Sequence, residues 1–407
     1  MEYQYKKQLS TKRCFQFVCV IFFLNRIIST NIFGDNSVLN SVYVSISKLL
    51  SLYYVIKYFY FYTQKRGILI RDFKCILAVV LYFFVILIST FNNDGNVRRI
   101  LMTAYPIIGT ICFIDIESRH YGREIVLAFF LFFNVILCWN FADMVLVRKV
   151  LKTGATELLI GGRNQLAIFL SICFASTLAY IELNSLKKGY TQKYVFIKLI
   201  ILMSAIFSGS ATSIFGILAI YILYIFNFTT AKSKILKPAI IALAYSVFWF
   251  SLIVFRMQYL ASDLIVNTLH KDLTLSHRTI IWDKALEMIS DKPILGYGMS
   301  DSVNIFTVNH DYTGKNNNVW TTLSGHNQIL QILYYGGIVL LLAFVFLYFV
   351  SCASERRKNH LFYIYFLSVI AVLIVWMTEV PSEYAMFTML GMCFYSERFE
   401  GKKYNIS

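Results

Sequence analysis

The stretch NQLAIFLSICFASTLAYIE, residues 164–182, decides the fold. Its single charged residue, Glu182, stands at its end. A helix needs roughly 20 apolar residues to cross a hydrocarbon core of ~30 Å. The stretch is therefore long enough and apolar enough to form a membrane-spanning helix.

Similar apolar runs recur along the whole chain of 407 residues, and we expect about twelve transmembrane helices. The expected spans are residues 14–33, 39–63, 74–91, 100–116, 125–142, 164–182, 195–208, 211–228, 238–256, 329–350, 361–379 and 383–397. Arg26 interrupts the first run and no small-residue cleavage site follows it, so we expect this run to remain as a helix. The predicted fold class is an all-α polytopic membrane protein, with residues 1–407 forming a single integral membrane domain.

The composition supports a chain that is dissolved in lipid. Apolar residues make up 58% of the sequence and charged residues only 15%, against roughly 25% in soluble domains. The mean hydropathy is +0.62. These values exclude a disordered protein and argue against a cytosolic enzyme. The net charge of +16 comes from basic residues in the gaps between apolar runs, so we attribute it to membrane topology and expect no nucleic-acid partner.

Basic residues also predict the orientation, because cytoplasmic loops retain Lys and Arg. With the N-terminus inside, the inner segments hold clusters such as Lys187-Lys188 and residues 356–358. Fewer basic residues fall in the short outer loops, namely Arg98, Arg99, Arg148, Lys149, Lys152 and Arg163. We therefore expect both termini in the cytoplasm.

One long outer loop, residues 257–325, separates the ninth and tenth expected spans, and loops of this length usually serve a function. Within it, Ser276 is placed to cap a short helix that runs to about Ser290. Gly296 and Gly298 follow in a turn. This turn either brings backbone N–H groups close to a ligand or is a tight connection after an interfacial helix.

Three polar side chains on the outer side are candidates for catalysis. Arg163 and Arg278 are suited to bind a diphosphate, because guanidinium is always charged and makes paired hydrogen bonds. The alternative is that each contacts lipid headgroups or a carboxylate in the loop. His326 lies where the long loop re-enters the membrane, and it is either a general base or an ordinary interfacial residue. Glu379 is either a functional charge inside the membrane or a sign that its span ends earlier.

Metal or disulfide chemistry has no support in the sequence. The eight cysteines lie within or beside apolar runs, where we expect them to pack as small apolar side chains. The six histidines show no HxxxH spacing. We expect no metal and no cofactor.

Four stretches, read together, resemble the bacterial O-antigen ligase and Wzy-type polymerase superfamily. They are residues 162–167 (GRNQLA), 208–212 (SGSAT), 278–282 (RTIIW) with 293–298 (PILGYG), and 325–328 (GHNQ). The expected topology also matches, with the main outer loop between the ninth and tenth spans. The resemblance covers residues from about 160 to 350. Members often have an arginine where this chain has Ala211, which puts more weight on Arg163 and Arg278.

The resemblance implies a metal-independent membrane glycosyltransferase whose donor is an oligosaccharide on undecaprenyl diphosphate at the outer face of the bacterial inner membrane. His326 is implied as the base, Arg163 and Arg278 as the diphosphate clamp, and the reaction as inverting. Membrane lipid, a chain-length regulator and a flippase are implied as partners. The other motif residues are expected to bind substrate, namely Ser210, Asn164, Gln165, Trp282, Gly296, Gly298 and Asn327.

Three functions remain open. We favour a polymerase, which joins one lipid-linked repeat unit to another, because the loop shows no obvious contacts for lipid A. A ligase would transfer the glycan to the lipid A core instead. A flippase for the lipid-linked unit is less favoured, because the spans carry few ionisable residues. The product is O-antigen or a capsular polysaccharide.

Overall fold

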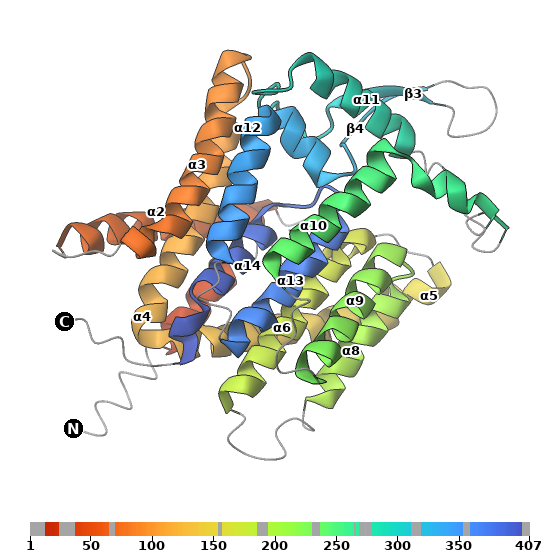
Figure 1. The fold of residues 1–407 in the computed structure, drawn as a ribbon. Helices are drawn as coiled ribbons and strands as arrows, with labels where there is room; N and C mark the ends of the chain where they lie inside the picture. Colours follow the sequence, from red (N-terminus) through yellow and green to blue (C-terminus); the bar gives the residue numbers. More distant parts are fainter. Residues whose placement is uncertain are drawn as a thin grey trace, which may run out of the picture.

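The computed structural model describes the chain in segments. They are residues 13–23, 37–64, 70–153, 157–184, 194–229, 237–263, 266–267, 273, 278–310, 319–352 and 359–400. Ser276, Lys187, Lys188 and residues 356–358 lie outside the described residues. Almost every described element is helical (Figure 1), which confirms the all-α class.

The bundle is built from apolar helices that coincide with the expected spans. They are Arg13–Phe23, α2 (Ser37–Gln64), α3 (Ile70–Asn92), α4 (Val97–Ala142), α6 (Leu166–Asn184), α8 (Val195–Phe207), α9 (Ala211–Thr229), α10 (Pro238–Trp249), α12 (Gln328–Ser351), α13 (His360–Trp376) and α14 (Tyr384–Phe394). By length and composition, five helical stretches in the described part of the chain are able to cross a membrane unaided, and the others are shorter.

The fourth and fifth expected spans are joined in α4, which bends at Tyr121 (φ −131°, ψ 35°) instead of ending there. A Cβ atom on the next residue, Gly122, would lie only 2.5 Å from the carbonyl oxygen of Arg398. The bend is therefore the place where the C-terminal 3-10 helix, Ser396–Glu400, packs against α4. This contact explains why no loop separates the two spans.

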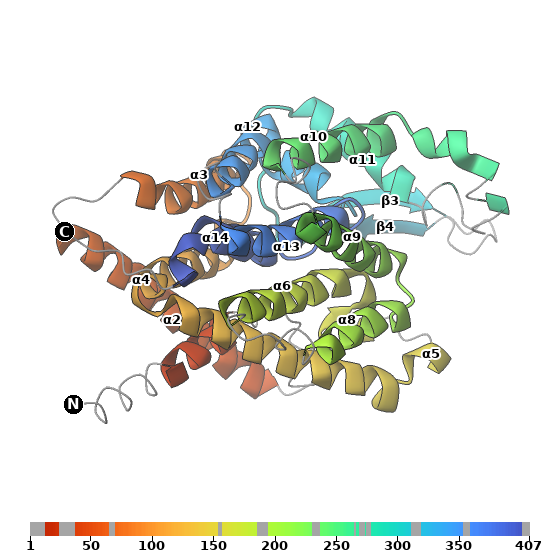
Figure 2. The same cartoon turned by 60° about the horizontal axis from the view of Figure 1, so that its bottom comes forward.

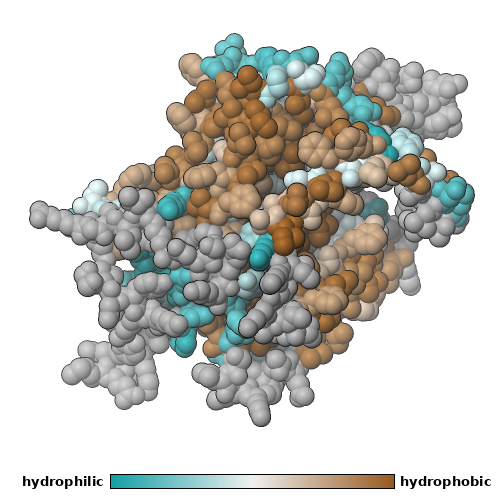
Figure 3. All heavy atoms as spheres, viewed as in Figure 1, coloured by the Kyte–Doolittle hydropathy of each residue, from teal (hydrophilic) through white to brown (hydrophobic). Residues whose placement is uncertain are grey.

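α13 and α14 form the centre of the bundle. Most of their side chains are buried, and Figure 2 shows them between α3, α12 and α10 on one side and α4, α6 and α8 on the other. The outer surface is strongly apolar, with side chains such as Phe91 exposed by 74%. In Figure 3 hydrophilic residues gather at the end of the molecule that carries α11 (Arg278–Asp291). This pattern fits a protein embedded in lipid.

The segment expected to form the long outer loop contains α11 and a hairpin that the sequence pattern does not predict. α11 ends close to the expected Ser290 and buries Ile281, Trp282 and Ala285. The hairpin consists of β3 (Phe306–His310) and β4 (Val319–Leu323), paired antiparallel with Phe306 opposite Leu323. A second small pair, β1 (Glu157–Leu158) and β2 (Gly161–Gly162), precedes α6.

α12 is broken at Gly336 and Gly337, so the tenth span is not one straight helix over 329–350. Its first half rises from the bundle and its second half descends beside α3 (Figure 1). The backbone N–H of Ile338 donates to the carbonyl of Pro293 at 2.8 Å. Gly337 has φ +59°, and a Cβ atom there would lie 2.2 Å from the carbonyl oxygen of Ile294. The turn after α11 is therefore packed into the break.

Short connecting elements complete the described chain. They are the π-helical turns Asp143–Val147 and Phe250–Val254, α5 (Val150–Thr153), and the 3-10 helices Arg163–Gln165 and Met257–Ala261. The 3-10 helix Arg163–Gln165 leads directly into α6, at the end of the bundle that carries the predicted site.

Candidate active site

A single carboxylate, Glu379, joins four segments that are far apart in the sequence. Its Oε1 accepts a hydrogen bond from Asn164 Nδ2 at 2.9 Å and another from Arg278 Nη2. Its Oε2 lies 3.6 Å from His326 Nδ1. Glu379 is only 8% exposed. Three of the residues predicted from the sequence are thus brought together by a fourth that was not among them.

The helix ends explain why these residues meet. Glu379 lies just after α13, Asn164 just before α6, Arg278 at the first residue of α11 and His326 just before α12. Helices that alternate in direction bring every second connection to the same end of a bundle. The expected span 361–379 does end earlier, at Trp376, which places Glu379 in the connection to α14 and not inside a helix.

His326 is held in a backbone conformation that residues other than glycine rarely adopt. Its φ is +42°, in the left-handed region, which costs of order 1–3 kcal/mol for a residue other than glycine. The next residue, Asn327, fixes this geometry. Its Oδ1 accepts from Leu330 N at 3.1 Å and from Trp249 Nε1 at 3.0 Å, and its Nδ2 donates to the carbonyl of Met377 at 2.9 Å.

Asn327 therefore positions its neighbour. Its side chain is fully buried, and both of its polar ends are occupied by protein groups. These contacts anchor His326 at the start of α12. That Asn327 also binds substrate, as the resemblance implies, stays a prediction.

The short connection between α8 and α9 supports the other side of the site. Ser210 Oγ donates to Asn164 Oδ1 at 3.0 Å, so Asn164 is held between Ser210 and Glu379. Ser213 Oγ donates to the backbone carbonyl of Arg163 at 2.7 Å. The small hydroxyl residues of this connection therefore orient residues 163 and 164.

The guanidinium of Arg163 is available at this end of the bundle. Among the described residues, its guanidinium has no ion-pair partner and no side-chain hydrogen bond. Its neighbour Gln165 is exposed. Arg278, in contrast, uses one nitrogen for Glu379 and is 17% exposed as a side chain.

The charges are arranged so that the site favours an anion. Burial by itself would raise the pKa of Glu379, but the imidazole of His326 and the charge of Arg278 outweigh it and hold the pKa below its usual range. The carboxylate is therefore ionised and balances one of the two arginines. The remaining positive charge of Arg163 has no ion-pair partner among the described residues, which leaves it suited to bind a phosphate group.

Trp282 and the two glycines lie apart from Glu379. Trp282 is one turn after Arg278 on α11 and fully buried, with the guanidinium of Arg256 centred 5.3 Å from its ring. The N–H groups of Gly296 and Gly298 donate to the carbonyls of Lys292 and Tyr335, at 3.1 and 3.0 Å. Both glycines serve close packing, and their contact with a substrate stays a prediction.

A groove with an apolar lining runs beside the site. It has a volume of about 370 Å³ and lies between α10, α12 and α13, with Tyr245, Leu333 and Phe344 among its walls. Trp249 lines it and also donates to Asn327, next to His326. Trp249 therefore connects the lining of the groove to Asn327, the neighbour of His326.

The described residues contain no group of three or more His, Cys, Asp or Glu side chains suited to hold a metal ion. All eight cysteines are free, and those at positions 19, 75, 112, 173, 352 and 393 are buried, in keeping with their expected packing role.

Comparison with known proteins supports the predicted resemblance. Residues 196–345 match the family model described as O-Antigen ligase. The chain is also 36% identical over 89 residues to a protein of Rickettsia conorii (strain ATCC VR-613 / Malish 7) that carries the provisional name of a polysaccharide ligase. That match covers 21% of this chain and 22% of the relative, so the chain spans about a fifth of the curated relative it matches. The resemblance to the O-antigen ligase and polymerase superfamily is confirmed.

Proposed function

We propose that this multi-pass membrane protein is a glycosyltransferase that polymerises undecaprenyl-diphosphate-linked oligosaccharide units. It would act on the outer face of a bacterial plasma membrane, with both termini in the cytoplasm, and make O-antigen or capsular polysaccharide. The observation that carries the proposal is the carboxylate of Glu379, which holds Arg278 and the imidazole of His326 at one site near the start of α6, where Arg163 has no partner among the described residues.

The two arginines suit the leaving group. When the anomeric C–O bond breaks, its electron pair leaves with the lipid diphosphate, on which negative charge builds up. Fixed guanidinium groups stabilise such charge without having to reorganise. Arg163 offers all of its donors, and Arg278 offers those that Glu379 does not use.

His326 suits the acceptor. Because Nδ1 faces Glu379, Nε2 is the ring nitrogen left to face a substrate, and a carboxylate behind Nδ1 favours the imidazolium that forms when Nε2 takes a proton. The distance of 3.6 Å is slightly longer than a hydrogen bond, and such contacts often shorten when substrate binds. The acceptor oxygen forms the new bond to the anomeric carbon as its proton passes to His326.

The apolar groove suits the lipid portion of the donor. It lies between helices of the bundle, has an apolar lining, and includes Trp249, which donates to Asn327 beside His326. A polyprenyl chain in this groove would leave its diphosphate close to His326 and the arginines. We propose direct displacement without a covalent intermediate and without a metal, which inverts the anomeric centre.

The test is the substitution Arg278→Ala, with Arg98→Ala as its matched control. Arg98 is exposed and lies in a different outer connection, at the start of α4. Purified protein would be given the lipid-linked unit, and the release of undecaprenyl diphosphate would be measured. We expect Arg278→Ala to abolish release while Arg98→Ala retains it. Unchanged release with Arg278→Ala would remove this residue from the mechanism.

A ligase is the second candidate, because the matched family model is described as O-Antigen ligase and the matched protein carries the provisional name of a polysaccharide ligase. A gel of surface glycan and lipid-linked intermediates from a deletion strain separates the two. A single repeat unit on its final anchor, in place of a ladder, supports the polymerase. Full-length chains left on undecaprenyl diphosphate support the ligase, and units trapped on the cytoplasmic side support a flippase. A polymerase would work with a flippase that delivers its donor and with a chain-length regulator.

A further inference from the structure

A second pocket lies at the same end of the molecule as Glu379 but is built from other residues. It has a volume of about 630 Å³, within the ~300–1,000 Å³ range of small-molecule sites. One wall is the turn between α3 and α4, residues 93–97, and the other is the segment 292–301 that follows α11. Tyr334, in the rising half of α12, closes the back.

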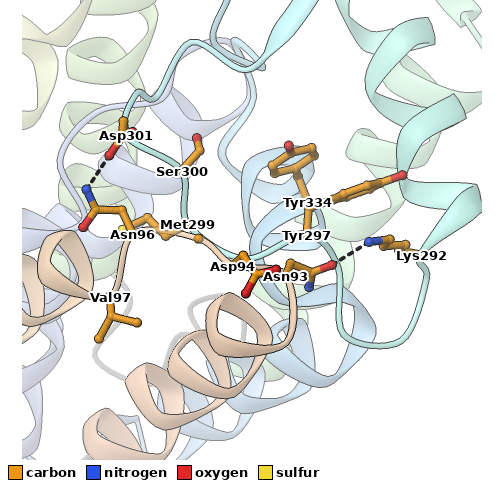
Figure 4. A pocket seen from close by; sticks show the side chains of 12 residues that line it. Asn93, Asp94, Asn96, Val97, Lys292, Tyr297, Met299, Ser300, Asp301 and Tyr334 are labelled. Atoms are coloured by element: carbon orange, nitrogen blue, oxygen red, sulfur yellow. Dashed lines mark hydrogen bonds between the residues drawn. The ribbon is translucent and has the colours of Figure 1, made fainter.

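Hydrogen bonds tie the two walls together, so the pocket is preformed. Asn96 N donates to the carbonyl of Met299 at 2.8 Å, and the Asn96 side chain donates to Asp301. At the other end, Lys292 Nζ donates to Asn93 Oδ1 at 2.5 Å. Figure 4 shows these two pairs at opposite ends of the pocket.

Asp94 lies between the two pairs and is available for a ligand (Figure 4). It is exposed, and among the described residues no hydrogen bond or ion pair holds its carboxylate. Its backbone has φ +51°, in the left-handed region. Asp301 offers a second carboxylate, of which only one oxygen is used by Asn96.

The pocket also contains a pair of stacked tyrosines. The rings of Tyr297 and Tyr334 are 4.9 Å apart with an angle of 15° between their planes. Lys292 Nζ lies 4.6 Å from the centre of the Tyr297 ring. Tyr334 is largely buried, whereas Tyr297 remains partly exposed to the pocket.

The chemistry of this lining differs from that of the two neighbouring sites. Two aspartates and one lysine give it no excess of positive charge, so it does not suit a diphosphate as Arg163 and Arg278 do. Its polar groups do not suit a lipid chain. Carboxylate, amide and hydroxyl groups beside aromatic rings suit a ligand with many hydroxyl groups and apolar C–H faces.

We infer that this pocket binds uncharged sugar units of the glycan substrate. The inference rests on the proposed function, because it extends it from the lipid and diphosphate to the sugars. The rising half of α12 connects the two sites: from Asn327 to Tyr334 the helix advances about 10 Å at 1.5 Å per residue. A short oligosaccharide attached at the diphosphate site can span this distance.

The test uses the substitution Asp94→Gly in the full-length protein, purified in detergent. Glycine adopts the left-handed conformation without strain, so the change removes the carboxylate and leaves the turn intact. Lys149→Gly is the matched control, because Lys149 is exposed, has φ +46° and lies in a different connection. The probe is the free oligosaccharide, released by mild acid from the lipid-linked units that accumulate in a strain lacking this gene.

We expect the wild-type protein and Lys149→Gly to bind the oligosaccharide equally, and Asp94→Gly to bind it about tenfold more weakly or worse. Inorganic diphosphate should not displace it. The inference is overturned if the wild type does not bind the oligosaccharide, if Asp94→Gly binds it as tightly, or if diphosphate displaces it.

Two further measurements separate this inference from the proposed function. Undecaprenyl diphosphate should bind equally to the wild type and Asp94→Gly, and its failure to bind the wild type would refute the donor proposal while leaving the sugar pocket standing. Displacement of the free oligosaccharide by the intact lipid-linked unit would assign the pocket to the donor's sugars. If the lipid-linked unit does not displace the free oligosaccharide, the pocket is assigned to the sugars of the acceptor.

Discussion

Replacing Glu379 by Gln should nearly abolish glycan transfer, although the substitution exchanges only one heavy atom of the side chain. Gln keeps the size and one carbonyl oxygen of Glu379, so the hydrogen bond from Asn164 can survive. What it loses is the negative charge that Arg278 and His326 share. The change therefore tests whether the carboxylate, and not merely its shape, organises the site.

The structure sets the expected magnitude. Hydrogen bonds to charged groups contribute about 1.5–3 kcal/mol each. Both charged contacts of Glu379 are largely buried, with side-chain exposures of 17%, 30% and 10% for Arg278, His326 and Glu379. If about 3 kcal/mol of this support acts on the transition state, transfer should slow roughly 10²-fold.

A second glutamate in the same connection provides the control. Glu383 is buried, and this raises its pKa to about 7, while hydrogen bonds from Tyr82 and Gln328 act to lower it. At pH 6 Glu383 is therefore largely protonated, and Gln closely resembles it. Glu379, whose pKa is held below the usual range, is ionised at that pH. The substitution of Glu by Gln should therefore slow transfer strongly at position 379 and change it little at position 383.

The assay is the initial rate of undecaprenyl diphosphate release at pH 6 by the purified variants, with folding checked by elution from a sizing column. We expect Glu379→Gln to lose at least about 10²-fold and Glu383→Gln to stay within about threefold of the wild type. Near wild-type transfer by Glu379→Gln, or equal losses in both variants, would refute the reasoning.

Three other predictions follow from the contacts. His326→Gln should lower kcat with little change in the KM for the donor, as steady-state kinetics would show, and equal damage to both would indicate a structural role. Because the folded-state pKa of Glu383 is about 7 against an ordinary 4.5, its contribution to stability is present below pH ~4.5 and is lost as pH rises through 7. Thermal unfolding at pH 5 and 8 should show a loss of about 2.5 kcal/mol that Glu383→Gln removes. Gly337→Ala should prevent stable insertion, because its Cβ would meet the carbonyl of Ile294, whereas Gly162→Ala, with open space around it, should be tolerated; membrane fractions on an immunoblot test both.

The sequence was sufficient for the helices. The described part of each expected span lies mostly in an apolar helix, with the fourth and fifth spans joined in α4, because the length needed to cross a membrane is contained in single stretches such as residues 164–182. The break in α12 was missed, although the adjacent glycines Gly336 and Gly337 are the kind of signal that marks one. The segment that packs into the break begins at Pro293, more than 40 positions earlier in the sequence. No local pattern shows that contact.

For the candidate site, residue type and position at helix ends pointed to Arg278 and His326, and the family resemblance added Asn164. From the sequence, Glu379, which joins them, was recognised only as a charge near the end of an apolar span. Glu379 is 53 positions from His326 and more than 200 from Asn164, so its role depends on which helix ends meet, and hydropathy does not show that. Asn327, Gly296 and Gly298 make hydrogen bonds within the protein, which local patterns do not show either, and their contact with a ligand stays a prediction.

The central claim is that this chain transfers glycan from a lipid diphosphate at the site organised by Glu379. The most direct measurement incubates the purified wild-type protein with the undecaprenyl-diphosphate-linked repeat unit alone and follows both the glycan and the lipid. We predict a ladder of longer lipid-linked glycans, with one undecaprenyl diphosphate released for each unit added. An unchanged repeat unit with no undecaprenyl diphosphate released, in a preparation that is folded and binds the donor, would contradict the polymerase proposal.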